Sequence, residues 1–180
     1  MNLFIADTHF GHINVLHFDK RPFSDVDEMW NVMKDLWNGR VTKKDDIWIL
    51  GDFCFRNAKN PVEYLKELNG KKHLIIGNHD RDLLKNDEAM KYFVSVDTYK
   101  KIHDYGRTLI LCHYPIAEWD GYFRGTYHIY GHIHNSTNDA YHFMKDKERA
   151  LNAGCMINNY APVFLDELIN NNELFKKNNP

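Results

Sequence analysis

The chain has 180 residues, of which 43% are hydrophobic and 27% are charged, and its formal net charge at pH 7 is -2. This composition is ordinary for a globular protein and argues against disorder, and the length fits one domain that buries its own core. A balance so close to neutral offers no basic face, so we expect no tight binding of long nucleic acid, whereas short nucleotides stay open as ligands.

The cysteines and the apolar runs set two further limits. Three cysteines lie far apart and form no C-x-x-C pair, which is typical of reduced thiols and leads us to expect a cytoplasmic protein. No apolar run approaches the length that a membrane-spanning helix needs, so we expect no membrane partner.

The first predicted element is a strand over residues 3–6, where an apolar run leads into Asp7-Thr8-His9. A helix is predicted next, with Ser24 as its N-cap and acidic residues in its first turn. Gly39 marks the end of this helix, because glycine is common just past a helix C-terminus. The apolar positions in between follow helical spacing and indicate a face that packs against the core.

The middle of the chain alternates strands with helices. A strand over residues 47–50 ends at Gly51-Asp52, and another over residues 72–76 runs into the tetrapeptide 77–80, Gly-Asn-His-Asp. A helix is predicted over residues 82–93. Strands that alternate with helices are typical of an α/β fold.

The second half of the chain begins with a predicted β-hairpin. Residues 95–103 and 108–112 are the two strands, and the segment 104–107, Asp-Tyr-Gly-Arg, supplies the turn. His113 follows the second strand directly. A metal-ligand type therefore stands at this strand end too.

A further strand over residues 127–130 runs into the segment 131–134, Gly-His-Ile-His. The last predicted helix covers residues 163–169, and the polar tail 171–180 is expected to fray. We therefore expect all 180 residues to form a single domain, with its core in residues 1–170.

Five predicted strand ends thus carry His, Asp or Asn side chains. Residues two apart on an extended chain face the same side, so one strand end can offer two ligands to a shared site. Imidazole and carboxylate without clustered thiolate suit Mn, Fe, Zn or Ni rather than a structural zinc cage. The candidate site residues are Asp7, His9, Asp52, Asn78, His79, Asp80, His113, His132 and His134.

The order and types of these blocks resemble the calcineurin-like metallophosphoesterases, hydrolases that use two metal ions. The blocks span residues 7–134, and the stretch 7–12 is similar to small bacterial and phage members of that family. Any one block is weak evidence, but five in the same order make coincidence implausible. The resemblance implies a four-layer α/β/β/α sandwich with two mixed β-sheets.

The resemblance also implies a ligand set for two divalent metal ions, with manganese favoured. Asp52 would bridge the two ions, which would generate a bridging hydroxide as the nucleophile and clamp the phosphoester. The first ion would be held by Asp7, His9, Asp52 and His134, and the second by Asp52, Asn78, His113 and His132.

Two residues beside the ligands have other implied roles. By resemblance, His79 contacts the phosphate and protonates the leaving oxygen, as a histidine can near neutral pH. Asp80 is expected to orient His79 by accepting a hydrogen bond from its ring. The segment after Asp52 departs from many family members, because Phe53-Cys54-Phe55 stands where they carry a polar residue.

Substrate contacts are less sharply indicated by the sequence. His12 lies close enough to Asp7 and His9 in the chain to reach a bound phosphate. Trp119 and Arg124 lie in a long aromatic loop that either stacks a base and grips a phosphate or packs as an Ω-type loop, and both alternatives stay open.

The expected function is metal-dependent hydrolysis of a small phosphomonoester or phosphodiester, including nucleotide-like esters. One alternative is a nuclease or a cyclic-nucleotide phosphodiesterase, which would act on diesters. Another is a binding or scaffold protein that keeps the fold without turnover, although such proteins usually lose ligands and this chain keeps all of them.

Overall fold

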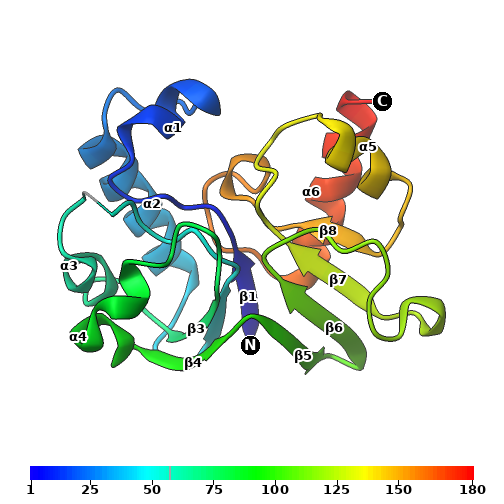
Figure 1. The fold of residues 1–180 in the computed structure, drawn as a ribbon, viewed down its shortest axis with the longest axis horizontal. Helices are drawn as coiled ribbons and strands as arrows, with labels where there is room; N and C mark the ends of the chain where they lie inside the picture. Colours follow the sequence, from blue (N-terminus) through cyan, green and yellow to red (C-terminus); the bar gives the residue numbers. More distant parts are fainter. Residues whose placement is uncertain (57) are drawn as a thin grey trace.

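Two four-stranded sheets pack face to face in the middle of the molecule, with helices outside both (Figure 1). This computed structural model describes residues 1–56 and 58–180. The strand order is β1-β2-β3-β4 in the first sheet and β5-β6-β7-β8 in the second. The strands are β1 (Asn2–Ile5), β2 (Asp46–Ile49), β3 (Lys71–Ile75), β4 (Phe93–Asp97), β5 (Tyr99–Asp104), β6 (Arg107–Cys112), β7 (Tyr127–Tyr130) and β8 (Ala150–Asn152).

The helices form the two outer layers, so the predicted four-layer α/β/β/α sandwich is confirmed. On the side of the first sheet lie α1 (Ile13–Phe18), α2 (Val26–Arg40), α3 (Pro61–Leu65) and α4 (Asp87–Met90). On the side of the second sheet lie α5 (Asp139–Lys145) and α6 (Leu165–Asn178). Three short 3-10 helices are η1 (Leu83–Lys85), η2 (Tyr122–Arg124) and η3 (Cys155–Ile157).

The two sheets differ in strand direction. All neighbouring strands of the first sheet are parallel, so the prediction of a mixed sheet is wrong there. The chain crosses over through helices between these strands, and such crossovers make neighbouring strands parallel. The second sheet is mixed as predicted, because the β5–β6 hairpin is antiparallel while the other pairs are parallel.

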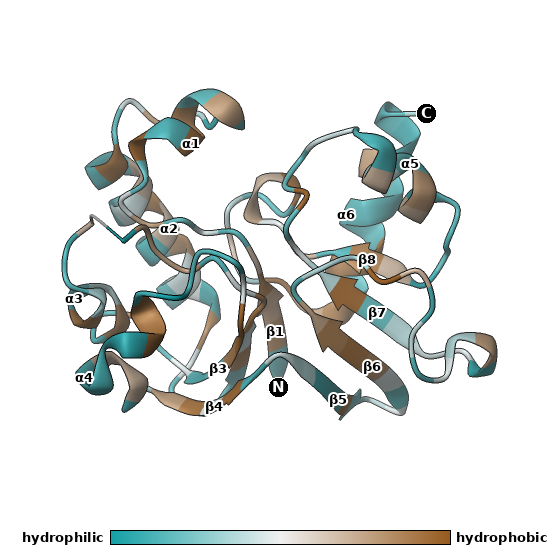
Figure 2. Cartoon of the chain, in the orientation of Figure 1, coloured by the Kyte–Doolittle hydropathy of each residue, from teal (hydrophilic) through white to brown (hydrophobic). Residues whose placement is uncertain are grey.

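Alternating side chains fill three apolar layers between the four layers of structure. Leu3 and Ile5 of β1 face the helices, whereas Phe4 faces the second sheet. In β6, Leu109 and Leu111 face the first sheet. Both faces of the inner strands are thus buried, which explains why they read as continuous apolar runs, whereas the edge strands β4 and β5 expose alternate residues. Figure 2 shows β6 hydrophobic over much of its length, while the visible side of α6 is largely hydrophilic.

Helix α2 begins one residue later and ends two residues later than its sequence signals indicate. Asp25 is the N-cap, and its carboxylate accepts hydrogen bonds from the backbone amides of Asp27 and Glu28. Ser24 instead donates its hydroxyl hydrogen bond to the Glu28 carboxylate at 2.6 Å. Gly39 lies inside the helix, which ends at Arg40. Two adjacent capping residue types make such a shift hard to foresee.

Two segments on either side of β4 also differ from expectation. The helix predicted over residues 82–93 is broken into η1 and α4, because the Asn86 side chain caps a new helix by accepting the Ala89 amide hydrogen. The strand predicted over residues 95–103 is two strands, β4 and β5, which belong to different sheets. The hairpin turn itself is confirmed, with Tyr105 and Gly106 both at positive φ.

The C-terminal helix continues well beyond its predicted end at residue 169. Helix α6 runs to Asn178, so most of the tail expected to fray over residues 171–180 is helical. Asn172 is buried, and its side chain donates to the carbonyls of Asn152 and Leu168. The Tyr141 hydroxyl donates to the carbonyl of Asn179. These contacts dock a segment whose polar sequence predicts a loose end.

Within residues 1–56 and 58–180, no helix has the length and apolar character needed to cross a membrane.

Candidate metal centre

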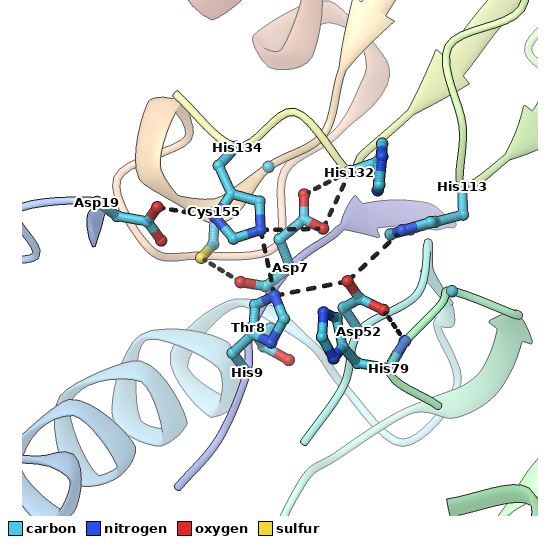
Figure 3. A network of polar contacts seen from close by, with 12 residues as sticks. Asp7, Thr8, His9, Asp19, Asp52, His79, His113, His132, His134 and Cys155 are labelled. Carbon is cyan, nitrogen blue, oxygen red and sulfur yellow. Dashed lines mark hydrogen bonds and ion pairs between the residues drawn. The ribbon is translucent and has the colours of Figure 1, made fainter. Parts of the chain in front are cut away.

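Strands from both sheets end at one edge of the sandwich, and the loops that follow them bring the predicted ligands together (Figure 3). From the first sheet, β1 leads to Asp7, β2 to Asp52 and β3 to Asn78. From the second sheet, β6 leads to His113 and β7 to His132. Parallel strands place their carboxyl ends at the same edge, so ligands distant in sequence converge.

The first set of side chains is Asp7, His9, Asp52 and His134, whose ligand atoms all lie within 4.8 Å of one another. We call it the closed group. Nε2 of His9 lies 3.2 Å from Nε2 of His134 and 3.5 Å from Oδ2 of Asp52. Nε2 of His134 lies 3.9 Å from Oδ1 of Asp7. Two imidazole nitrogens and two carboxylates that face one point are a donor set for a divalent transition metal.

The second set is Asn78, His113 and His132, which we call the open group. Oδ1 of Asn78 lies 3.1 Å from Nε2 of His113 and 3.0 Å from Nδ1 of His132. Oδ2 of Asp52 lies 3.6 Å from Nε2 of His113. The Asp52 carboxylate is therefore within reach of both groups, as the dashed lines from it to His9 and His113 in Figure 3 show.

The backbone is strained where it delivers these ligands. Five of them have left-handed backbone conformations, with φ between 47° and 71°, a region that residues other than glycine rarely adopt. Each such residue costs on the order of 1–3 kcal/mol, and this strain is characteristic of functional sites. The five are Asp7, His9, Asp52, His132 and His134.

The glycines that precede the ligands leave room for the strand exits to pack closely. A Cβ on Gly51, whose φ is +85°, would lie 2.4 Å from Nδ1 of His113. A Cβ on Gly77 would lie 2.4 Å from Oδ1 of Asp52. The strand exits approach each other so closely that a side chain at either glycine would displace a candidate ligand.

The electrostatics of the closed group suit a bound cation. Burial raises the pKa of Asp7 to about 6, so burial disfavours its charged form, and a bound cation would stabilise that form. Burial, followed by the neighbouring His134, lowers the pKa of His9 and keeps its imidazole neutral. A neutral imidazole and an ionised carboxylate are the forms that ligate metals, so these residues fit divalent ions.

A buried ion pair behind the closed group escaped the sequence analysis. Oδ1 of Asp19 lies 2.8 Å from Nδ1 of His134, on the opposite side of the ring from the other ligands (Figure 3). Arg21 donates to Oδ2 of Asp19 at 2.8 Å and to the carbonyls of Asp7 and Thr8 at 2.9 and 2.8 Å. A carboxylate behind a ligating histidine fixes the tautomer and orientation of its ring.

The pKa values of His134 and Asp19 reflect the same contacts. Burial lowers the pKa of His134, but the hydrogen bond and charge of Asp19 outweigh it and the net pKa is raised. Burial raises the pKa of Asp19, but its contacts with His134 and Arg21 outweigh that effect and the net pKa is lowered. The only sequence signal for these residues is the charged run 19–21, Asp-Lys-Arg, between Phe18 and Phe23.

His79 and Asp80 are both beside the ligands, but Asp80 does not have the arrangement predicted for it. The Asp80 carboxylate accepts hydrogen bonds from the backbone amides of Asp52, Phe53 and Gly77, at 2.8 to 2.9 Å, rather than from the ring of His79. Asp80 therefore fixes the exits of β2 and β3 to each other. The His79 amide donates to Oδ1 of Asp52 at 2.8 Å, and the His79 side chain is exposed.

The three tentative substrate contacts fall in different places. His12 lies beside the centre, with its ring stacked on Phe55 at 4.0 Å and 5.5 Å from the ring of His9. Trp119 is buried in the outer core, where its indole donates to the carbonyl of Thr126 at 2.8 Å. Arg124 is exposed in η2, before the amino end of β7, whereas the ligands follow its carboxyl end.

The positions of Trp119 and Arg124 therefore do not support the predicted substrate role, and they agree with the packed-loop alternative. The loop starts at the ligand edge, after β6, and crosses to the amino end of β7, and Trp119 and Arg124 lie in its later part, where Trp119 is buried. The aromatic loop instead covers the outer face of the second sheet, where Trp119 packs with Ile110 and Tyr130.

Two cavities flank the ligands. One of about 680 Å³ includes Asp19, Lys20, His132 and His134 in its wall. The other, of about 350 Å³, lies on the side of His79 and is lined by Phe55, Arg56, Asn78, His79, Arg81 and Asp82. Space for substituents therefore exists on both sides of the centre.

Comparisons with known proteins give a consistent result. A family model described as the calcineurin-like phosphoesterase superfamily domain matches residues 1–162. MJ1445, an uncharacterised protein of Methanocaldococcus jannaschii, is 34% identical over 167 residues, covering 92% of this chain and 87% of that protein. The crystal structure of AQ665, a protein of unknown function from Aquifex aeolicus, has a TM-score of 0.70 and 30% identity, covering 91% of this chain and 94% of that one.

Proposed function

The chain belongs to the calcineurin-like phosphoesterase superfamily, and from this premise we propose that it is a phosphoester hydrolase that depends on two divalent metal ions. The observation that carries the proposal is the position of Asp52. Its Oδ2 lies 3.5 Å from Nε2 of His9 and 3.6 Å from Nε2 of His113, so one carboxylate faces both ligand groups. A shared carboxylate of this kind is what a two-metal hydrolase needs.

In this proposal the closed group, which includes Asp52, holds one ion. The open group holds the other ion together with the same Asp52 carboxylate. The mixture of imidazole, carboxylate and amide donors suits Mn, Fe, Zn or Ni, and manganese is favoured. When bound, the two ions supply positive charge for the phosphate and lower the pKa of water toward neutrality. The neutral side chain of Asn78 helps to keep the net charge of the centre positive.

We propose His79 as the group that contacts the phosphate and protonates the leaving oxygen. Its backbone amide is tied to the Asp52 carboxylate, while its side chain is exposed on the wall of the smaller cavity. The backbone at His79 is therefore held beside the ligands while its ring is open to a substrate, and histidine is the most frequent general acid in enzymes. His12, 5.5 Å from the ring of His9, is close enough for a second contact with the substrate.

The proposed substrate is a small phosphoester, monoester or diester, including nucleotide-like esters, and the proposed location is the cytoplasm. A diester, as in a nuclease or cyclic-nucleotide phosphodiesterase, is favoured by one observation. Cavities on both sides of the centre leave room for two substituents on one phosphorus. A scaffold without turnover fits less well, because the chain keeps every residue that the proposed ligand set needs, and five of them have strained backbone conformations of the kind that cluster at functional sites.

A substrate panel tests this proposal. Metal-stripped protein is reloaded separately with Mn, Fe, Zn and Ni, and each form is assayed with p-nitrophenyl phosphate, bis(p-nitrophenyl) phosphate and cyclic nucleotides. We expect turnover of at least one ester with at least one metal, and its loss in Asp52→Ala. Asp35→Ala, which removes an exposed aspartate from α2, is the matched control. Absence of turnover with all metals, or full activity of Asp52→Ala, would contradict the proposal.

A further inference from the structure

We propose that the cavity beside His79 binds a second phosphate, carried by the leaving group of the substrate. The inference rests on the proposed hydrolytic function and specifies its substrate. It predicts a phosphodiester whose leaving alcohol bears its own phosphate, as the neighbouring nucleotide in a short single-stranded oligonucleotide does.

The first argument is the position of the cavity relative to the proton donor. His79 lines it together with Asn78, at the open group. The atom that His79 protonates is the leaving oxygen, so the rest of the leaving group must lie on the same side as His79. The residues of this cavity therefore contact the leaving group rather than the substituent that stays on phosphorus.

The second argument is the charge of the two arginines in the cavity wall. Arg56 and Arg81 are exposed, and in the described part of the chain neither guanidinium lies within 4.0 Å of a carboxylate oxygen, although both act on the charge of Asp82 from further away. Every other arginine has one within 4.0 Å, namely Arg21, Arg40, Arg107, Arg124 and Arg149. Asp82, which shares the cavity wall, is paired with Lys85 at 2.9 Å.

Two guanidinium groups without carboxylate partners, on one cavity, are suited to an anion. The planar guanidinium donates two parallel hydrogen bonds to phosphate oxygens, which makes arginine the usual residue for this recognition. The phosphate undergoing hydrolysis lies at the metal ligands. Arg56 and Arg81 therefore remain available for a second phosphate in the same molecule.

The third argument is the shape and aromatic character of the cavity. Phe55 lines it, and the ring of His12 stacks on Phe55, parallel within 2° at 4.0 Å. A third cavity, of about 260 Å³, shares Phe55, Arg56 and His79 with the cavity beside His79 and extends toward Asn60 and Asn86. A supported aromatic ring beside cationic groups is typical of surfaces that bind single-stranded nucleotides.

The test compares three thymidine dinucleotides: TpT, pTpT with an added 5′-phosphate, and TpTp with an added 3′-phosphate. In the metal-loaded wild type we expect one of the two phosphorylated dinucleotides to have a kcat/KM about tenfold above that of TpT, since charge-assisted contacts are strong. Which of the two gains identifies the leaving oxygen as 3′ or 5′. The ratio of kcat/KM values is the readout.

The variants Arg56→Ala and Arg81→Ala should each reduce this ratio severalfold, and the double variant should bring it to about one. Arg124→Ala is the matched control, because it removes an equally exposed arginine far from the cavity and should keep the wild-type ratio. A wild-type ratio near one for both phosphorylated dinucleotides would overturn the inference, and so would a ratio that persists in the double variant.

Failure of this inference and failure of the proposed function give different results. If TpT and bis(p-nitrophenyl) phosphate are hydrolysed but the added phosphate brings no advantage, the hydrolytic function stands and only the second-phosphate site is refuted. If no dinucleotide and no nitrophenyl ester is hydrolysed with any metal, both are refuted.

Discussion

The closed group and the open group of the centre are built to different degrees of enclosure. Asp7, His9 and Asp52 are at most 2% exposed, and the Asp19–Arg21 pair supports the closed group from behind. Asn78 and His132 of the open group are exposed beside His79. Both groups share Asp52, so the difference arises in the surroundings and not in the bridging residue.

This difference suggests that the two groups bind their metal ions with different affinities. In the closed group a buried carboxylate orients His134, whereas in the open group the Leu50 carbonyl orients the buried His113, and His132 is exposed. An amide oxygen carries no charge and is a weaker ligand than a carboxylate. We therefore expect the closed group to hold the tighter ion and the open group to hold the ion that exchanges and faces the substrate.

Substitution of Asp52, which both groups share, should have the largest effect on metal binding and on turnover. It should affect the closed group and the open group alike. In Asp52→Ala both groups lose their common ligand, so we expect metal content to fall from two ions and turnover to fall about 1000-fold or more, because metal ions contribute several kcal/mol to transition-state stabilisation. Metal analysis and a steady-state assay measure the two losses. Retention of two ions would show that Asp52 is not shared.

Removal of His79 should reduce turnover while leaving both metal sites intact. For His79→Ala we expect kcat to fall roughly 100-fold to 10,000-fold, the range for loss of a general acid. Both ions should remain, since the His79 ring belongs to neither group. Metal analysis alongside kcat distinguishes a general acid from a metal ligand. A His79→Ala variant that loses metal would place His79 among the ligands.

Substitution of Asp19 should affect the closed group selectively. Asp19→Asn keeps the size of the side chain but removes the charge that faces His134 and Arg21. We expect the affinity of the tighter ion to fall about 10-fold to 100-fold, as for other residues that orient a ligating histidine. The affinity of the weaker ion should change little.

Competition with a chelator of known affinity measures both constants for Asp19→Asn. His132→Ala is the complementary variant and should weaken the exchangeable ion instead. Equal weakening of both ions by Asp19→Asn would mean that the pair supports the fold in general, and the proposed positioning of His134 would be withdrawn.

The smallest effect is expected far from both groups. Arg124→Ala removes an exposed side chain that pairs only with Asp120, and exposed pairs contribute little. We expect KM and kcat within about twofold of the wild type for all substrates. A larger rise in KM would return the aromatic loop to the list of substrate contacts.

The sequence predicts the ligand-bearing strand ends well, for a physical reason. A strand buried on both faces is apolar throughout, so a histidine or aspartate directly after it stands out. Asp52 after β2 and His113 after β6 are clear examples. Glycine before the ligand adds a second signal, because a Cβ at Gly51 or Gly77 would collide with candidate ligands.

Contacts that depend on tertiary packing are beyond the reach of such patterns. Asp80 lies beside His79 in the chain, yet its carboxylate accepts backbone amides from two different strand exits. Asp19 and His134 are 115 positions apart, and only the fold brings them together. In the same way Asn172 makes a polar tail helical by docking on β8.

The central claim is that Asp52 joins two metal sites, and anomalous diffraction tests it most directly. Crystals grown with excess Mn²⁺ should show two anomalous peaks on either side of the Asp52 carboxylate, about 3.5–4 Å apart, as in other two-metal centres. One peak should lie among Asp7, His9 and His134, and the other among Asn78, His113 and His132. A single peak, or peaks that do not contact Asp52, would contradict the claim.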